Sequence, residues 1–489
     1  MNTGASWPGL DEAEARVLEI QTKLHRWAKH APNRQFVDLY NLVCDPAVLS
    51  VAWSRVRSNR GARSAGVDKV KPRSIESPTE TFLPRLRDEL KARTFTPLPV
   101  RERYIPKANG KTRRLGIATA RDRTVQAALK LILEPIWEAD FHPFSYGFRP
   151  NRRAQDAIAE IYNFTSNSYE WVLEADIAAC FDEISHSALM DRVRRRVGDK
   201  RILALVKAFL KAGILSEDGV TRETHTGTPQ GGILSPLLAN IALSLLDDHF
   251  AEAWATFGNN QARSYRRSKG LPTYRVVRYA DDFVVLVAGT RTQAENLRNE
   301  VATVLSPMGL RLSDEKTGIC HIDEGFTFLG WRIQRQTMNG TKRKRFVYTW
   351  PSKKALASIK AKVRTITRQG TNTPLAHLLR QLNAVLRGWT NYFRHGVSAA
   401  TFSYLHQFTW RRVICWLRSK YRRANWKELR RRHLPRWWPT DGEMTLFDPA
   451  RVAITRYRFR GAAIPSPWES VAQGSVNDRR LDLVESRMR

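Results

Sequence analysis

Two adjacent carboxylates, Asp281 and Asp282, constrain this chain more than any other feature of its sequence. They lie between two β-rich apolar runs, residues 274–279 and 283–287, which predict a hairpin with the acids at its turn. Acidic groups at the tip of a buried hairpin are costly unless something neutralises them, and hard divalent cations prefer carboxylate oxygens. Asp is also common in solvated turns, and for the pair by itself a solvated turn is the better explanation, so the case for a metal site depends on the surrounding residues.

A second β segment, residues 173–177, carries a further acid, Asp176, just before a stretch of small residues. If this segment pairs with the hairpin, three carboxylates converge. Such a set can hold two Mg²⁺ ions roughly 3.5–4 Å apart, an arrangement suited to in-line attack of a 3′-hydroxyl on a phosphate. These residues therefore indicate a metal-dependent site for phosphoryl transfer.

The net charge of the chain indicates a polyanionic partner. Its 489 residues contain 81 Lys and Arg against 47 Asp and Glu, a formal net charge of +34, and nucleic acid is the default partner of so basic a protein. The four cysteines lie far apart, without the spacing of a disulfide framework or a zinc module. No run of about eighteen apolar residues and no secretory signal is found. We therefore expect a cytoplasmic, nucleoid-associated protein with no membrane partner.

Hydrophobic periodicity divides the chain into three regions. Residues 9–60 predict helices and lead into a Gly- and Arg-rich loop, strands and helices alternate from 100 to 335, and helices dense in Arg, Lys and Trp follow after about 350. Residues 101–106 and 113–117 predict a β-hairpin, because an Asn-Gly pair lies between them. The alternating region is expected to be an α+β domain.

Several motifs together resemble those of group II intron reverse transcriptases. Tyr279-Ala280-Asp281-Asp282 is similar to the active-site hairpin of reverse transcriptases, and residues 176–182 resemble the other catalytic motif of that superfamily. Residues 227–241 look almost letter for letter like a motif of the group II intron enzymes. Further segments agree in the family's order, at 105–107, 113–117, 122–123, 145–150 and 328–331, and residues 386–393 are similar to its maturase, or thumb, region.

The resemblance implies an α+β fold of the right-hand polymerase type, with fingers, a palm built on an antiparallel sheet and a helical thumb. It predicts an N-terminal helical extension at 1–55, fingers and palm at 56–335, a thumb or maturase region at 336–425, and a basic nucleic-acid-binding segment at 426–489. The implied activity is that of an RNA-directed DNA polymerase, which extends a DNA primer on an RNA template with dNTPs. The family also binds its group II intron RNA, assists splicing, and supports retrohoming into target DNA.

Metal ligands follow from the resemblance position by position. Asp176, Asp281 and Asp282 would be the catalytic residues and would bind two Mg²⁺ ions, with Mn²⁺ as a substitute. The carbonyl of Ile177 would be a further metal ligand. Lys316 lies in a segment similar to the family's next motif, and the resemblance leaves its contact open.

Nucleotide and primer contacts follow in the same way. The nucleotide-binding residues would be Lys107, Arg113, Phe181 and Gln230, and Phe181 would exclude a ribose 2′-hydroxyl. The turn Phe328-Leu329-Gly330-Trp331 would support the primer end. From the residues alone, solvated charges on a hairpin explain Lys107 and Arg113 better, and Phe181 has a core aromatic as its alternative.

The region from 411 to 432 is dense in positive charge. It holds ten Lys or Arg against one acid, Glu428, and aromatic residues accompany them, with Trp410 directly before the region and Trp416, Tyr421 and Trp426 within it. Basic residues neutralise phosphates, whereas aromatic residues at helical spacing either pack inward or stack on bases. For each aromatic residue a place in the core is an equal alternative. The predicted nucleic-acid-binding residues are Arg411, Arg412, Arg422, Arg423, Arg430, Arg431 and Arg432.

One further expectation concerns DNA cleavage, and two alternatives to the expected role remain. The longest family members end in a nuclease domain with paired cysteines and histidines, and because no such cluster occurs here, we expect no cleavage of target DNA and a primer from elsewhere. One alternative is an RNA-binding maturase with a vestigial polymerase, against which the intact catalytic acids argue. The other is a polymerase recruited to phage defence, CRISPR spacer acquisition or sequence diversification.

Overall fold

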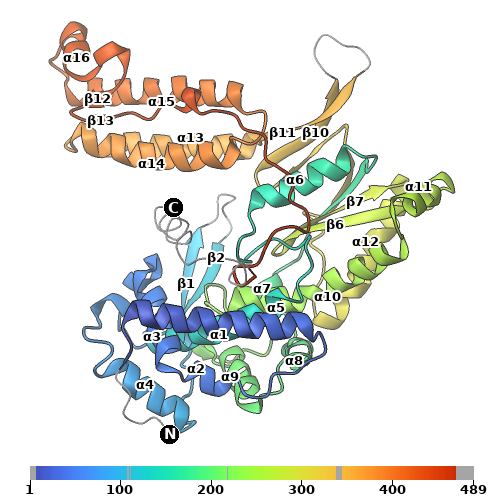
Figure 1. The fold of residues 1–489 in the computed structure, drawn as a ribbon. Helices are drawn as coiled ribbons and strands as arrows, with labels where there is room; N and C mark the ends of the chain where they lie inside the picture. The colour runs from blue at the N-terminus through green and yellow to red at the C-terminus, as the bar shows by residue number, and fades with distance from the viewer. Residues whose placement is uncertain (1–6, 107–109, 111, 217, 338–343, 470–489) are drawn as a thin grey trace.

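The computed structural model describes residues 7–106, 110, 112–216, 218–337 and 344–469 of the chain. Figure 1 shows the N-terminal helices below a central region of sheets and helices, and a bundle of long helices above it. Lys107, one of the predicted nucleotide-binding residues, lies outside the described residues.

The N-terminal helices pack around a long buried helix, α5 (Ala120–Glu138). Along α1 (Leu10–His30) the apolar residues Val17 and Leu24 recur at helical spacing and are buried against this core. The side chain of Asp45 accepts a hydrogen bond from the backbone of Ala47 and so caps α3. The remaining elements of this region are α2 (Tyr40–Val43), α3 (Pro46–Ser58), η1 (Arg60–Arg63), η2 (Pro72–Ser74) and α4 (Phe82–Lys91).

The predicted hairpin at 101–117 is present as β1 (Val100–Pro106) and β2 (Thr112–Ile117), which are antiparallel. β1 also pairs in parallel with β4 (Ile214–Leu215), and β5 (Thr221–Arg222) completes this small sheet. Figure 1 shows the hairpin projecting upward from the N-terminal helices toward the C-terminal helices.

The central sheet is antiparallel throughout, with the strand order β6-β7-β3-β8. Because side chains alternate along a strand, Leu173 and Val285 join the core shared with the N-terminal helices, whereas Val172 and Val284 join a second core on the other face. The strands are β3 (Trp171–Asp176), β6 (Thr273–Tyr279), β7 (Asp282–Ala288) and β8 (Gly318–His321).

Helices cover both faces of the central sheet. The buried residues of α6 (Ala154–Thr165) lie in one core, and those of α10 (Ser235–Thr256) and α12 (Arg291–Leu305) lie in the other. Burial on both faces explains why β7 is apolar along almost its whole length. The other helices of this region are α7 (Cys180–Glu183), α8 (His186–Arg194), α9 (Lys200–Leu210), α11 (Asn260–Ser268) and η3 (Ser306–Met308).

A second antiparallel sheet leads into a helical bundle. β9 (Phe326–Phe328), β10 (Trp331–Thr337) and β11 (Arg345–Pro351) precede α13 (Lys353–Arg368), α14 (Leu375–Phe393) and α15 (Ala399–Lys420). The apolar sides of these helices form a third core, which also contains Leu434 and Leu446. We call residues 353–447 the C-terminal bundle, which ends with α16 (Trp426–His433), η4 (Pro435–Trp437), β12 (Thr440–Asp441) and β13 (Met444–Thr445).

After the C-terminal bundle and η5 (Pro449–Arg451), the chain runs back beside the rest of the molecule (Figure 1). Arg460 pairs with Asp156 of α6 at 2.7 Å, and Lys29 of α1 pairs with Glu469 at 2.5 Å. The described part of the segment predicted at 426–489 therefore contributes to the bundle core and also contacts α6 and α1. No helix in the described residues is long and apolar enough to cross a membrane.

Candidate active site

The structure brings the predicted carboxylates together at one end of the central sheet. Asp176, the last residue of β3, lies directly opposite Asp282, the first residue of β7, in the antiparallel register. Tyr279 also pairs with Asp282, so Ala280 and Asp281 form a two-residue turn between β6 and β7. The β-rich runs and the turn predicted at this place are therefore present.

Burial, together with the neighbouring carboxylates, raises the pKa of Asp281 and of Asp282. Partial desolvation, a hydrogen bond with Asp176, and the charges of Asp281 and Asp176 raise the pKa of Asp282 to about 7. Desolvation is also the main cause of a raised pKa at Asp281. Where carboxylates are crowded and resist ionisation, a bound cation is favoured because it offsets their negative charge.

A cationic side chain lies at this site. The ammonium group of Lys316 donates a hydrogen bond to Oδ2 of Asp176, and this contact raises the pKa of Lys316. A backbone contact joins the segment before Lys316 to Asp176, because the Ser313 N–H donates a hydrogen bond to the Asp176 carbonyl oxygen at 2.8 Å. The structure thus shows for Lys316 a contact that could not be assigned from the sequence.

The donor atoms, though not the present arrangement of the described side chains, suit a divalent cation. Carboxylate oxygens are the ligands that hard cations prefer, and three carboxylates lie within electrostatic reach of one another here. Within the described ranges, no group of three or more His, Cys, Asp or Glu side chains is arranged so that it could hold a metal ion as it stands. Ile177, the predicted backbone ligand, directly follows β3 and bridges to Leu312.

A buried arginine supports the turn that carries Asp281. The side chain of Arg278 is fully buried and makes a two-pronged ion pair with Asp247 of α10, with N···O distances of 2.8 and 2.5 Å. Its guanidinium also donates to the Asn240 side chain at 3.0 Å, the Ser145 hydroxyl at 2.7 Å and the Ala280 carbonyl at 3.0 Å. A single side chain thus ties the turn to α10 and to the segment around Ser145.

The backbone of this turn is strained and closely packed. Ala280 has a φ of +59°, a region that L side chains seldom adopt. A Cβ atom added to Gly147 would meet the backbone nitrogen of Ala280 at 2.3 Å, so only glycine fits there. Strain of this kind persists where surrounding contacts determine the conformation, and Arg278 and Gly147 supply such contacts.

Two of the sequence motifs pack against each other beside Asp176. Thr228 N donates to the Phe181 carbonyl at 2.6 Å, and a Cβ atom on Gly227, whose φ is +79°, would meet that carbonyl oxygen at 2.6 Å. The Phe181 side chain is half-buried against the core. The carbonyl of Gln230 accepts a hydrogen bond from Gly116 of β2 at 2.8 Å, which ties this motif to the hairpin.

The two adjacent arginines of β2 have different surroundings. Arg113 is exposed, lies opposite Ile105, and its charge partly offsets the rise in the pKa of Asp281. Arg114 forms longer ion pairs with Asp182 at 3.4 Å and Glu102 at 3.6 Å. The charge of Arg113 therefore acts on Asp281, whereas the charge of Arg114 is partly neutralised.

The turn predicted to support the primer end joins the sheets to the C-terminal bundle. Phe328 and Trp331 are paired, and between them Leu329 and Gly330 have φ values of +49° and +81°. Trp331 is buried and packs on Phe393 of α14 with ring centroids 4.8 Å apart. The hydroxyl of Tyr392 donates to the Leu329 carbonyl at 2.9 Å. A movement of the bundle would therefore be transmitted to this turn.

Six of the seven arginines predicted to bind nucleic acid are exposed. Arg412 is half-buried and donates to the Thr367 hydroxyl at 3.0 Å, and Arg432 pairs with Glu428 at 2.9 Å. The aromatic residues among these arginines differ in burial, since Trp416 is buried in the bundle core while Trp426 is exposed. The exposed arginines without an ion pair in the described part of the chain are Arg411, Arg422, Arg423, Arg430 and Arg431.

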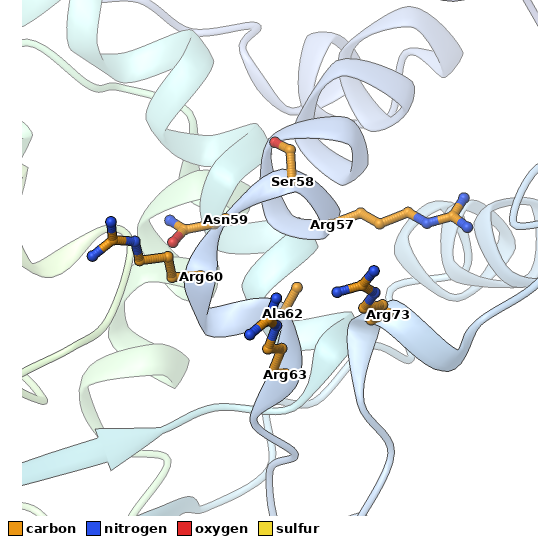
Figure 2. Close-up of a pocket in the computed structure, with 7 residues that line it drawn as sticks. All are labelled: Arg57, Ser58, Asn59, Arg60, Ala62, Arg63 and Arg73. Atoms are coloured by element: carbon orange, nitrogen blue, oxygen red, sulfur yellow. The ribbon is translucent and has the colours of Figure 1, made fainter. Parts of the chain in front are cut away.

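A further concentration of positive charge lies at the end of α3. Figure 2 shows a pocket whose lining includes Arg57, Arg60, Arg63 and Arg73, with Arg57 and Arg60 extending to opposite sides. Among the described residues none of these four guanidinium groups makes an ion pair. This pocket lies at the Gly- and Arg-rich loop, whose sequence by itself indicates no role.

Sequence reasoning missed the contribution of Arg278 and Asp247. A signal was present, because Arg278 is a charged residue in a β-rich run, three positions before Asp281, and Arg is rarely buried without a partner. The partner could not be named, since Asp247 lies 31 residues away on a helix.

Comparisons with known proteins place the chain in a family. Residues 105–333 match the model of the family described as reverse transcriptase (RNA-dependent DNA polymerase), and residues 356–438 match the group II intron, maturase-specific domain. The chain is 39% identical over 359 residues to Protein YkfC of Escherichia coli (strain K12), covering 69% of this chain and 93% of that protein. The chain belongs to the group II intron reverse transcriptase and maturase family.

Two further relatives are longer than this chain. Group II intron-encoded protein LtrA of Lactococcus lactis subsp. cremoris is 31% identical over 373 residues, which are 67% of this chain and 61% of that protein. Putative COX1/OXI3 intron 1 protein of Saccharomyces cerevisiae is 27% identical over 395 residues, 73% of this chain and 46% of that protein. This chain therefore spans less than two thirds of either relative.

Family membership confirms the main functional predictions. The chain is an RNA-directed DNA polymerase with a maturase domain, and its mixed helices and sheets agree with a right-hand polymerase fold. Polymerases of this family use divalent metal ions, and the maturase domain implies binding to intron RNA.

Proposed function

We propose that the protein extends a DNA primer on an RNA template with dNTPs, at a site formed by Asp176, Asp281 and Asp282. The observation that carries this proposal is the register of the central sheet, which places Asp176 opposite Asp282 with Asp281 in the adjoining turn. In this proposal the central sheet is the palm, the β1–β2 hairpin belongs to the fingers and the C-terminal bundle is the thumb.

The three carboxylates, with the Ile177 carbonyl, would hold two Mg²⁺ ions, for which Mn²⁺ can substitute. When bound, these ions stabilise negative charge on the attacking 3′-hydroxyl and on the leaving pyrophosphate. Fixed cations beside them offset charge on the phosphates of the incoming nucleotide. Arg113, exposed on β2, and Lys107, which follows β1 in the sequence, supply these cations in our proposal.

Side chains around the carboxylates would select and align the substrates. We assign Phe181 to the face of the sugar, where its ring excludes a 2′-hydroxyl, and Gln230 to the nascent base pair. The strained turn from Phe328 to Trp331 would hold the primer end, since a hydrogen bond from Tyr392 and ring packing by Phe393 fix this turn to the bundle.

The proposed RNA partner is the group II intron that encodes the protein, whose splicing and retrohoming into target DNA it would assist. The exposed arginines of the C-terminal bundle and the arginine-lined pocket of Figure 2 support this part, because guanidinium groups outside ion pairs are available to neutralise phosphates. A net charge of +34 also fits a cytoplasmic protein associated with the nucleoid.

Primer extension on an RNA template tests the polymerase proposal. Asp281→Asn and Asp176→Asn should each lower the extension rate about a hundredfold or more, because metal ligation contributes several kcal/mol to stabilising the transition state. Asp191→Asn is the matched control, since Asp191 is an exposed acid on α8. Extension at the control rate by either site variant would contradict the assignment.

A further inference from the structure

Two tryptophans lie exposed beside each other at the end of the C-terminal bundle. Trp426 begins α16 and Trp437 ends η4, and they are 37% and 48% exposed. Their ring centroids are 6.3 Å apart. Large aromatic side chains contribute most to folding when buried, so two neighbouring exposed rings indicate a contact surface. Figure 1 shows α16 at the end of the bundle away from the central sheet.

The backbone that presents Trp437 is strained and firmly anchored. Arg436 and Trp437 have φ values of +54° and +66°, the left-handed region in which residues other than glycine are rare. On one side of them Leu434 is buried in the bundle core. On the other, Trp438 stacks on His406 and donates from Nε1 to the Leu446 carbonyl at 2.6 Å. Strain held by anchors on both sides is typical of functional segments.

A third tryptophan fixes the position of the exposed ring. Trp410 of α15 donates a hydrogen bond from Nε1 to the Trp437 carbonyl at 2.9 Å. The Trp437 backbone is thus bound to the bundle while its side chain remains exposed. Such a preorganised ring can bind a flat ligand at little cost in conformational entropy.

Cationic groups accompany both exposed rings. The guanidinium of Arg430 lies 4.0 Å from the ring centroid of Trp437, and that of Arg418 lies 5.9 Å from the ring centroid of Trp426. Neither arginine makes an ion pair with a carboxylate in the residues described. Aromatic faces beside such cations suit a ligand that has both a flat ring and a negative charge, which an unpaired nucleotide has.

We propose that Trp437, Trp426 and Arg430 form a stacking platform for an unpaired base of the polynucleotide that the C-terminal bundle binds. The proposal rests on the proposed RNA binding and adds to it the form of the ligand, a single-stranded segment rather than a duplex. In a duplex both faces of each internal base are covered by stacking, whereas a base in a loop or an end can lie on an aromatic ring. A polynucleotide is favoured over a peptide because residues 411–432 carry ten basic residues against one acid.

Binding of single-stranded and duplex RNA of the same length tests the platform, measured with the full chain across a salt series. Trp437→Ala should weaken single-strand binding by roughly 5- to 140-fold, the range that corresponds to removal of one stacked base. Its affinity for duplex and the slope of its salt dependence should stay unchanged, since no charge is removed. Trp437→Phe should retain most of the affinity, because a ring at this position can still stack.

Trp27→Ala is a matched control, because Trp27 of α1 is 40% exposed and also lies beside an arginine, Arg34, at 4.9 Å. Wild-type single-strand affinity in Trp437→Ala would overturn the platform, and so would an equal weakening for single-strand and duplex. Single-stranded DNA in the same series shows whether the sugar contributes to binding. If DNA binds more weakly than RNA and its binding also falls in Trp437→Ala, both strands use the same stacking site.

The outcome can be separated from that of the proposed function. If neutralising Arg422, Arg423 and Arg431 weakens binding while Trp437→Ala does not, the platform is wrong and the charged surface stands. If Trp437→Ala weakens single-strand binding while the arginine variant does not, the platform stands and the charged surface is wrong.

Discussion

The guanidinium of Arg278 donates a hydrogen bond to the carbonyl oxygen of Ala280, 3.0 Å away, inside the turn that carries Asp281. The same group is paired with Asp247 of α10 and is fully buried. The position of a candidate catalytic carboxylate thus depends on an ion pair that never meets solvent. Breaking such a pair by removing one partner is costly, because an uncompensated charge remains.

Arg278→Lys keeps the charge but removes most of the five hydrogen bonds that the guanidinium donates. We expect kcat for primer extension to fall roughly 10- to 100-fold and the Mg²⁺ concentration needed for half-maximal activity to rise, since outer contacts position metal ligands. The matched control is Arg192→Lys, because Arg192 is a buried arginine paired with the neighbouring Asp248 at 2.6 Å. If kcat and the Mg²⁺ requirement changed equally in both variants, Arg278 would have only a structural role and no specific part in positioning Asp281.

The local elements of this fold could be predicted because they follow from patterns close in sequence. Apolar runs predicted the β6–β7 hairpin within a residue at each strand end, and an Asn-Gly pair between β-rich runs predicted the β1–β2 hairpin. The contact between Lys316 and Asp176 spans 140 residues, and no local pattern specifies it. The same limit applied to the aromatic residues of α15 and α16, where helical spacing could not separate buried Trp416 from exposed Trp426.

A change at Phe181 tests sugar selection. Phe181→Val should remove bulk beside the sugar and raise incorporation of rNTPs relative to dNTPs by about 10- to 100-fold, the usual scale for steric discrimination in a pocket. Phe209→Val controls for a general weakening of packing, because Phe209 is a buried aromatic residue of α9 in the same core. Single-turnover kinetics with both nucleotide types would give the ratio. An unchanged ratio would show that another residue excludes the 2′-hydroxyl.

The exposed arginines of the bundle should determine the salt dependence of RNA binding. Replacing Arg422, Arg423 and Arg431 by Gln should reduce the log–log salt slope by about 0.7–0.9 for each phosphate that is no longer neutralised. Three exposed arginines that already pair with acids, Arg85, Arg194 and Arg291, form the control set. A filter-binding series with group II intron RNA would measure both slopes. If both triple variants showed the wild-type slope, the RNA would bind elsewhere on the protein.

The stability of the protein should depend on pH through Asp140. Burial raises the pKa of Asp140 to about 6, although the guanidinium of Arg196, 3.0 Å away, lowers it. Because this value exceeds that of the unfolded chain, the folded state holds the proton more tightly, and the contribution of Asp140 to the free energy of unfolding is lost as pH rises from about 4 to 6. Asp140→Asn should remove up to about 3 kcal/mol of this dependence. Urea unfolding at several pH values measures it, and Asp191→Asn, with its exposed carboxyl, should leave the profile unchanged.

The contact between Lys316 and Asp176 predicts competition between a side chain and a divalent cation. The ammonium group contacts Asp176, one of the carboxylates proposed to bind the metal ions, so binding of an ion through this carboxylate must displace it. Lys316→Met should therefore tighten Mn²⁺ binding, by up to about fivefold because the lysine side chain is largely exposed and its ion pair is screened by water. In the absence of metal the variant should unfold at a lower temperature, since the carboxylates lack a compensating charge, and added Mg²⁺ should raise its unfolding temperature more than that of the wild type.

Calorimetry of Mn²⁺ binding and thermal unfolding with and without Mg²⁺ measure these two effects independently of polymerase activity. Lys269→Met serves as the control, because Lys269 is an exposed lysine at the end of α11 whose ammonium group lies near the Tyr265 ring and not near the carboxylates. Weaker Mn²⁺ binding in Lys316→Met than in the control would mean that the lysine assists the metal site instead of competing with it. Asp176→Asn in the Lys316→Met background should abolish the gain, since the lysine and the metal ion compete for that one carboxylate.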